Sequence, residues 1–176
     1  MSPVITTEQL SLRPFRIEDA QRVSKHAGRP AIARMVQNVP CPYPQLAVEG
    51  WIMLHDSLRR RSQAFPFAVA TDADGLVGAA GLHRTRGGWI LGYWIGEPWQ
   101  GRGYASEAAG ALRDFAAGQL NLPVIGAEWF EDNPASGRVL EKAGFTPTGK
   151  TAERFSLGRR ARARSVEMEW RSGAAH

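Results

Sequence analysis

The stretch Gln100-Gly101-Arg102-Gly103-Tyr104-Ala105 decides the fold, because of the segments on either side of it. Residues 89–95 (WILGYWI) are aromatic and β-branched and predict a buried strand. The segment after the glycines predicts an amphipathic helix, because apolar residues recur at helical spacing: Ala105, Ala108, Ala109, Leu112, Phe115 and Ala116. The first amides of a helix lack helical partners, and the helix dipole favours negative charge there. The stretch therefore predicts either an anion site, where glycines admit a phosphate, or simply a tight connection from strand to helix.

Two other phosphate-binding loops do not fit this stretch. A P-loop requires Gly-Lys-Ser or Gly-Lys-Thr at the end of the turn, and neither tripeptide occurs in the chain. A dinucleotide fingerprint requires a third glycine three residues after Gly103, where this chain has Ser106. A nucleoside triphosphate or a dinucleotide is therefore not the expected ligand.

Three other segments fit one family in the correct order. They are residues 10–15 (LSLRPF) followed by EDA at 18–20, residues 78–83 (GAAGLH) followed by GYWI at 92–95, and residues 132–145 (DNPASGRVLEKAGF). Together with the Gln/Arg-x-x-Gly-x-Gly/Ala pattern at 100–105, they resemble the GNAT acetyltransferases, in the form used by the RimJ/RimL branch. The resemblance runs from about residue 8 to residue 170.

The resemblance implies a single acetyltransferase domain over residues 1–176 with an α+β GNAT fold. Its sheet would be mixed, mostly antiparallel and seven-stranded, splayed between the fourth and fifth strands, with helices on both faces. The expected strands are residues 8–15, 66–71, 76–83, 89–95 and 123–129, with two more after Phe145 that join around Leu157-Gly158. The expected helices are 19–26, 30–36, 45–61, the one after the Gly-rich stretch, and 133–142. His55 lies on the apolar face of helix 45–61, so we expect it in the core rather than in catalysis.

Composition narrows the function classes further. The formal net charge of +5 and pI near 10 favour an anionic cofactor or partner. The single cysteine, Cys41, excludes an internal disulfide and suits a reducing compartment. The histidines and Cys41 lack metal-ligand spacing, so no metal is expected. No apolar run is long enough for a membrane span, and charges from Glu8 to Asp19 interrupt any signal peptide, so we expect a cytoplasmic protein.

Nucleic-acid binding has little support beyond the net charge. The cluster Arg159, Arg160, Arg162 and Arg164 falls in the predicted terminal hairpin and lacks interleaved aromatic residues. We expect it to be a solvated strand face.

The resemblance assigns a site for acetyl-CoA as cosubstrate. Amides of the loop from Gln100 to Ala105, with Gly101, Arg102, Gly103 and Tyr104 between them, would hold the pyrophosphate. The fourth strand, through Tyr93, Trp94 and Ile95, would run along the pantetheine arm, and one of its backbone N–H groups would stabilise the oxyanion. Asn133 would cap the following helix and contact the pantetheine amide. Ser136 would protonate the leaving thiolate, since Leu140 occupies the position where many other GNAT members have a tyrosine.

The group that deprotonates the amine is less well defined. Branch members often carry a glutamate in the fourth strand, where this chain has Ile90. Glu128 on the fifth strand is the first candidate, and Glu153, His83 and a chain of water molecules are the alternatives.

The sequence therefore predicts an N-acetyltransferase that moves acetyl directly from acetyl-CoA to a primary amine. The branch resemblance implies the N-terminal α-amine of a protein as acceptor, with a homodimer left open. Two alternatives remain: acetylation of a small amine (a polyamine, an amino acid or an antibiotic), and a non-catalytic module that binds CoA.

Overall fold

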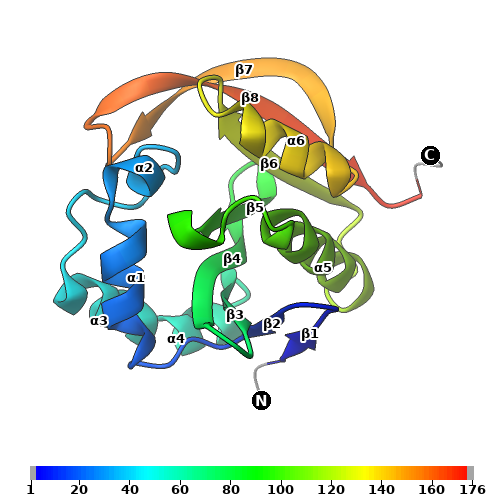
Figure 1. The fold of residues 1–176 in the computed structure, drawn as a ribbon. Coiled ribbons are helices and arrows are strands. Elements are labelled where there is room, and N and C mark those ends of the chain that lie inside the picture. Colours follow the sequence, from blue (N-terminus) through cyan, green and yellow to red (C-terminus); the bar gives the residue numbers. More distant parts are fainter. Residues whose placement is uncertain (1–2, 174–176) are drawn as a thin grey trace.

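The computed structural model describes residues 3–173, which form one mixed sheet flanked by helices (Figure 1). In this part of the chain the sheet has eight strands in the order β1-β2-β3-β4-β5-β6-β8-β7. Their bounds are β1 Ile5–Thr6, β2 Ser11–Arg13, β3 Ala64–Thr71, β4 Gly75–Thr85, β5 Gly88–Ile95, β6 Val124–Phe130, β7 Thr146–Ser156 and β8 Ala161–Arg171. Neighbouring strands are antiparallel except β5 and β6, which are parallel.

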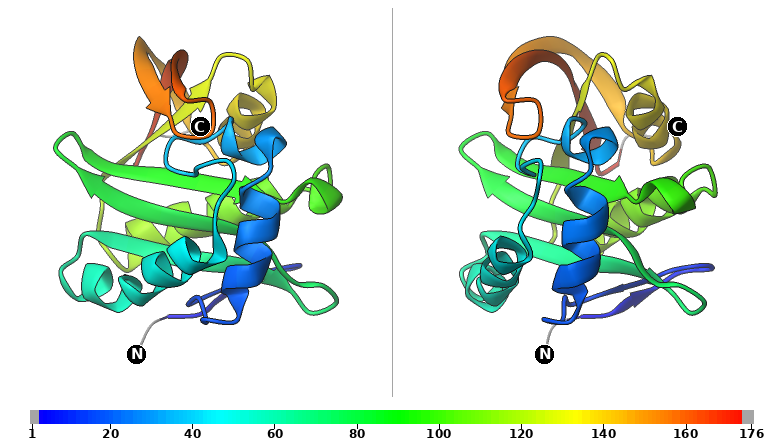
Figure 2. Two further views of the ribbon diagram at one scale, coloured as in Figure 1. Left: turned by 90° about the vertical axis from the view of Figure 1, so that its left-hand side faces the viewer. Right: turned by 60° about the vertical axis from the view of Figure 1, so that its left-hand side comes forward.

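Helices cover both faces of this sheet (Figure 2). The bounds are α1 Asp19–Ala27, α2 Pro30–Ala33, α3 Gln45–Met53, α4 His55–Arg60, η1 Glu97–Trp99, α5 Tyr104–Gly118 and α6 Pro134–Lys142. A hydrophobic core lies on each face of the sheet, and side chains that alternate along β3 contribute to both. Phe67 and Val69 pack on the side of α5, whereas Ala68 packs on the side of α1 and α3. The predicted two-sided α+β architecture is therefore confirmed.

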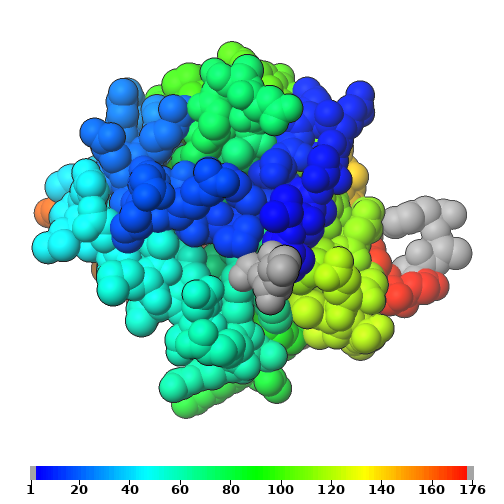
Figure 3. Space-filling model, turned by 90° about the horizontal axis from the view of Figure 1, so that it is seen from below, coloured from blue at the N-terminus to red at the C-terminus, as the bar shows by residue number. Residues whose placement is uncertain are grey.

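The first strands lie against the end of α5. Seen from below, dark-blue β1 and β2 lie beside the yellow-green segment that follows α5 (Figure 3). Ile5, Leu120 and Leu122 pack against the same core. At the start of α5, the Glu107 carboxylate accepts hydrogen bonds from Thr7 Oγ1 at 2.5 Å and from the Gln9 backbone N–H at 2.8 Å.

The parallel pair β5–β6 opens soon after it forms, as predicted for the fourth and fifth strands. The pairing is confined to Ile90 opposite Gly126 and Leu91 opposite Ala127, while β5 stays paired with β4 up to Ile95. Gly126 lets the strands meet there, because a Cβ at this position would lie 2.7 Å from Ile90 Cδ1. Beyond Leu91, the edge of β5 that faces β6 is free of strand pairing within the described residues.

Two predicted elements differ from the observed ones. The expected first strand, 8–15, is shortened to β2, and an additional strand, β1, precedes it. The two are separated by a turn in which the Thr7 backbone N–H donates to the Leu10 carbonyl at 2.9 Å. This raises the strand count from the predicted seven to eight. The expected helix 45–61 divides at Leu54, where the backbone N–H bonds the Trp51 carbonyl three residues back instead of four. After this tightened turn His55 is buried, as predicted, and its ring contacts Trp51 at 4.2 Å between centroids.

The prediction of a solvated arginine face is wrong for Arg159. This residue lies in the turn between β7 and β8, and its side chain is only 12% exposed. Its guanidinium stacks on Phe130 at 4.6 Å and donates to both carboxylate oxygens of Asp132 at 2.6 and 2.7 Å. Arg159 therefore fastens the terminal hairpin to the segment before α6.

Candidate active site

Two cavities meet where β5 leaves β6. The larger, of about 820 Å³, opens on the side of α1 and α3, and the smaller, of about 520 Å³, extends toward the Gly-rich loop. Tyr93, Trp94 and Ser136 line both cavities, together with Met35 and Val36 from the segment after α2. The two cavities therefore adjoin beside the splayed strands, and these shared residues form their junction.

The Gly-rich loop lines the far part of the smaller cavity. Gly101 and Gly103 both have left-handed φ angles, +76° and +83°, and a Cβ on either would meet no atom within 4 Å. The loop is tied to the end of β5, because the Gln100 side-chain amide donates to the Ile95 carbonyl at 3.0 Å. Arg102 is exposed and donates to the Pro98 carbonyl at 3.2 Å. The glycines are thus required by backbone geometry, and they leave the loop accessible to a ligand.

Helix α5 begins directly after this loop. Gly103 is its N-cap and supplies no side-chain cap, so the first backbone N–H groups of the helix lack that partner. Tyr104, Ala105 and Ser106 belong to this first turn and line the smaller cavity. The arrangement suits a phosphate group.

Helix α6 forms the opposite wall of the smaller cavity. Asn133 is its N-cap, but the side chain makes no capping hydrogen bond and lines the cavity instead. Arg138 and Lys142, one helical turn apart, line the same cavity. These two cations were not predicted at the site, although their i, i+4 spacing after the DNPAS motif places them on one face of the helix.

Tyr93 and Ser136 form a hydrogen bond across the junction. The Tyr93 hydroxyl lies 2.7 Å from Ser136 Oγ and also donates to the Ser136 carbonyl at 3.1 Å. Burial raises the pKa of Tyr93 to about 12, against the opposing effect of the bond from Ser136. Tyr93 is therefore a neutral phenol near neutral pH, and it holds Ser136 at the junction. Both residues were predicted at the site, but their contact was not.

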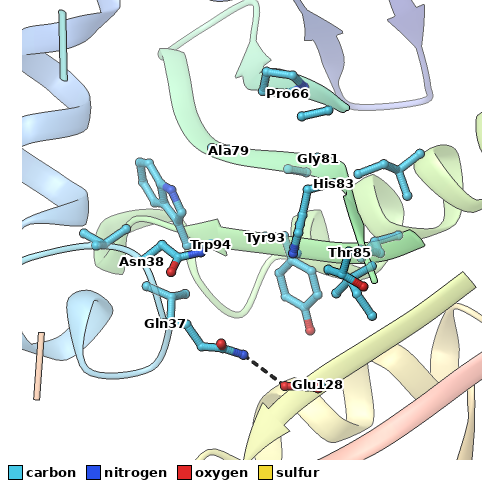
Figure 4. Close-up of a pocket in the computed structure, with 18 of the residues that line it drawn as sticks. Gln37, Asn38, Pro66, Ala79, Gly81, His83, Thr85, Tyr93, Trp94 and Glu128 are labelled. Carbon is cyan, nitrogen blue, oxygen red and sulfur yellow. Dashed lines mark hydrogen bonds between the residues drawn. The ribbon is translucent and has the colours of Figure 1, made fainter. Parts of the chain in front are cut away.

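Glu128 lies in the larger cavity and is held by an ion pair. Arg154 on β7 donates to both carboxylate oxygens, at 2.6 and 2.8 Å, and the Gln37 side-chain amide donates at 3.0 Å. The Gln37 bond is visible in Figure 4. Glu153, another predicted candidate, is exposed on β7. Neither Arg154 nor Gln37 was expected at the site, because no local pattern connects them with Glu128.

His83 lies on β4 at the wall of the larger cavity (Figure 4). It is opposite Ile90 on β5, so the two side chains share one face of the sheet. The surrounding protein lowers the pKa of His83 by desolvation, and the Glu128 carboxylate acts in the opposite direction. Although the residue is exposed to the cavity, its imidazole is therefore held in the neutral form near neutral pH.

The sequence matches the family described as acetyltransferase (GNAT) domain over residues 9–146. This chain belongs to the GNAT acetyltransferase family. The uncharacterized N-acetyltransferase p20 from Bacillus licheniformis is 29% identical to it over 147 residues, which cover 81% of this chain and 82% of p20.

Solved structures show the same GNAT fold. The ribosomal-protein-S5-alanine acetyltransferase from Vibrio fischeri has a TM-score of 0.82 at 19% identity, covering 98% of each chain. RimJ from Mycobacterium smegmatis, solved with a CoA disulfide, has a TM-score of 0.77 at 20% identity, covering 93% of this chain and 82% of RimJ. The fold is therefore shared with RimJ-type enzymes, as the sequence predicted.

This GNAT enzyme is an N-acetyltransferase, with acetyl-CoA as cosubstrate and an amine as acceptor. The predicted loop and the end of β5 line the smaller cavity, as binding of a long anionic cosubstrate requires. Within residues 3–173, no group of three or more His, Cys, Asp or Glu is arranged to hold a metal ion. In the same range, every helix is too short or too polar to cross a membrane.

Proposed function

We propose that this enzyme transfers acetyl directly from acetyl-CoA to the N-terminal α-amine of a protein or peptide. The observation that carries the proposal is the junction of the two cavities at Tyr93, Trp94 and Ser136. A cosubstrate in the smaller cavity and an acceptor in the larger one would meet there without a covalent enzyme intermediate.

The residues around the smaller cavity fit acetyl-CoA. First-turn amides of α5 and the loop from Gln100 to Ala105 would hold the pyrophosphate, and Arg138 and Lys142 add positive charge from α6. The unpaired edge of β5 at Tyr93 to Ile95 can bond the pantetheine arm as an added strand. Bound acetyl-CoA supplies an activated thioester, so the protein needs only to orient the partners, stabilise charge and move protons.

Two groups at the junction are suited to these tasks. A backbone N–H of β5 beyond Leu91 can stabilise negative charge on the carbonyl oxygen, because that edge lacks a strand partner. Ser136 Oγ can donate its proton to the departing sulfur, and the Tyr93 hydroxyl at 2.7 Å can hydrogen-bond the serine oxygen as this occurs. Asn133, whose side chain is free of capping, is available for the pantetheine amide.

Glu128 contributes charge on the acceptor side of the junction. Arg154 and Gln37 fix its carboxylate, which can attract the ammonium form of an acceptor into the larger cavity. Its predicted role as proton acceptor stays a prediction. Because Arg154 donates to both of its oxygens, proton uptake would compete with two charge-assisted hydrogen bonds.

The charges around the larger cavity favour an acceptor with one positive charge. Glu128 is the one carboxylate among the described residues that line it, and Arg84 and Arg86 also line it. A polyamine or an aminoglycoside carries several positive charges and would be repelled by these arginines. A peptide N-terminus has a single ammonium group, and an 820 Å³ open cavity can admit its first residues.

The proposal is tested by mass spectrometry of acetylation products. Purified protein is incubated with acetyl-CoA and, separately, an alanine-initiated peptide, the same peptide with a blocked N-terminus, spermidine, an aminoglycoside and free alanine. We expect acetyl on the α-amine of the free peptide and none on the blocked one. Acetylation of spermidine or the aminoglycoside alone would overturn the acceptor class, and no product with any amine would favour the non-catalytic CoA-binding alternative.

A further inference from the structure

Building on the proposed function, we propose that His83 is the general base that removes a proton from the ammonium group of the acceptor. Its side chain shares one face of the sheet with Ile90 and, across the parallel pair, with Gly126 and Glu128. Figure 4 shows His83 on β4 and Glu128 on β6, with β5 passing between them. His83 thus lies in the acceptor cavity on the face from which an amine would approach the junction.

The other ionisable groups that line this cavity are poorly suited to accept a proton near neutral pH. Burial raises the pKa of both Tyr43 and Tyr93, so these phenols stay protonated. Arg84 and Arg86 are permanently charged. This leaves Glu128, whose two oxygens are engaged by Arg154, and His83. Among the described residues, only His83 combines exposure to the cavity with a neutral nitrogen lone pair.

The groups that face His83 suit a temporary positive charge. From β6 the Glu128 carboxylate acts on the imidazole and favours its protonated form, while Arg154 on β7 moderates this effect through the ion pair. The residues opposite His83 on β3 and β5, Ala64 and Ile90, carry no charge. Desolvation keeps the resting imidazole neutral, and the carboxylate stabilises the imidazolium once the proton has arrived.

The proton balance of the reaction is complete with these groups. A nitrogen of His83 takes one proton from the acceptor ammonium, and the free amine attacks the thioester carbonyl carbon. As the carbon–sulfur bond breaks, Ser136 Oγ gives its proton to the departing sulfur. The nitrogen then loses its second proton, which returns to Ser136 through the Tyr93 hydroxyl, so both side chains end the cycle as neutral hydroxyls. The His83 imidazolium then releases its proton to water in the open cavity, so one proton enters solution for each amide formed.

The test is the pH dependence of kcat/KM with acetyl-CoA and the alanine-initiated peptide. His83→Gln should lower kcat/KM at pH 7 by roughly 100-fold, within the usual range for a lost general base. The rise of kcat/KM with pH that reports deprotonation of His83 (its limb of the pH profile) should disappear, while the Kd for CoA stays unchanged. Glu128→Gln should keep this limb but shift it to lower pH, because the His83 imidazolium loses the carboxylate that stabilises it. Glu18→Gln is the matched control, because Glu18 is exposed and lines neither cavity, and it should leave the profile unchanged.

A swapped variant separates catalysis from structure. His83→Ile combined with Ile90→His moves the imidazole to the directly opposite residue on the same face. Partial recovery of activity, together with a new limb in the pH profile, is expected if the imidazole acts as base. A purely structural role for His83 would leave that limb absent.

A measurement without an acceptor completes the test. The C2 proton of His83, followed by NMR, should titrate below the midpoint of free histidine, and lower still in Glu128→Gln. A wild type that acetylates the peptide, with a pH limb intact in His83→Gln, would overturn the role of His83 and leave the proposed function standing. Absence of acetylation by the wild type would overturn both the role of His83 and the proposed function. If His83 still titrated below free histidine in that protein, its surroundings would be as described, and the failure would lie in the proposed function.

Discussion

At the scale of single residues, the junction depends on one contact between distant parts of the chain. Tyr93 on β5 and Ser136 on α6 bond at 2.7 Å across the gap between the splayed strands. The phenol has a pKa near 12 and so remains protonated, and it holds the serine hydroxyl beside the junction of the cavities. In this position the Ser136 hydroxyl can give its proton to the departing sulfur of CoA and regain a proton through the Tyr93 phenol.

Ser136→Ala should lower kcat by roughly 10- to 100-fold, the lower end of general-acid effects, because the leaving thiolate loses its proton donor. The Kd for CoA, measured by calorimetry, should change little, since Ser136 is not needed for pyrophosphate binding. Tyr93→Phe is the companion variant, which keeps the serine and removes its partner, and it should have a smaller effect on kcat. Wild-type turnover in Ser136→Ala would contradict the proposed role.

At the scale of elements, the Gly-rich loop and α5 form a unit whose geometry is local. Gly103 has a φ of +83° and caps α5, so the loop must turn left-handed directly before the helix starts. Both loop glycines line the smaller cavity, and a Cβ on either would meet open space. A side chain at Gly103 would therefore disturb both the backbone and the binding surface.

Gly103→Val should raise the Kd for CoA by more than roughly 10-fold, because a branched residue disfavours positive φ and its side chain occupies the approach of the phosphate. Gly110→Ala is the control in the middle of the same helix, where a Cβ also meets open space. It should leave the Kd unchanged and stabilise the protein by about 0.5–1 kcal/mol. Unchanged affinity in a folded Gly103→Val protein would remove the loop from the site.

At the scale of the whole molecule, ligand binding and pH both act on folding stability. The smaller cavity is built from β5, the loop, α5 and α6, so a bound cosubstrate connects elements on both sides of the splay. On the opposite face, His55 is buried against aromatic rings, and neither of its ring nitrogens has a hydrogen-bond partner in the structure.

Acetyl-CoA should raise Tm well above the effect of ATP or NAD, because the loop lacks the sequence features of both competing phosphate sites. At 100 times its Kd, a ligand of the folded state adds about 2.7 kcal/mol. For a chain of this size the shift is roughly 5–10 °C, measured by scanning calorimetry at matched ligand concentrations. Equal protection by ATP would show that the loop has been assigned to the wrong ligand.

The protein should lose stability as the pH falls from 7 to 5. Desolvation lowers the pKa of His55 to about 4 in the folded state, against about 6.5 in the unfolded chain. The unfolded state therefore binds more protons in this window, so the His55 contribution is complete above pH ~6.5 and declines below it. His55→Phe keeps an aromatic ring and should reduce the loss between pH 7 and pH 5 by about 2 kcal/mol in urea unfolding. An unchanged loss would show that His55 does not titrate in this way.

The sequence predicted elements well where their causes are local, and less well where distant packing shapes them. Asp74-Gly75 at the start of β4 and Gly144 after α6 are local turn signals, and both glycines have the left-handed φ angles that such turns need. The division of helix 45–61 at Leu54 was not readable, because packing of His55 against Phe15 and Trp51 involves a segment far away in the chain. The structural role of Arg159 was missed for the same reason, since Phe130 ends β6 and Asp132 follows it, nearly 30 residues earlier in the chain.

By itself, the sequence determined the family, the order of the main elements and the residues of the Gly-rich loop, because periodicity and glycine placement act over a few neighbouring residues. Only the tertiary structure decided which side chains lie together: Tyr93 with Ser136, Arg154 with Glu128, and His83 with Glu128 in the wall of the larger cavity. These contacts depend on strand register and on the opening between β5 and β6, and both are set by packing between segments remote in sequence. The two cavities meet at the junction for that physical reason.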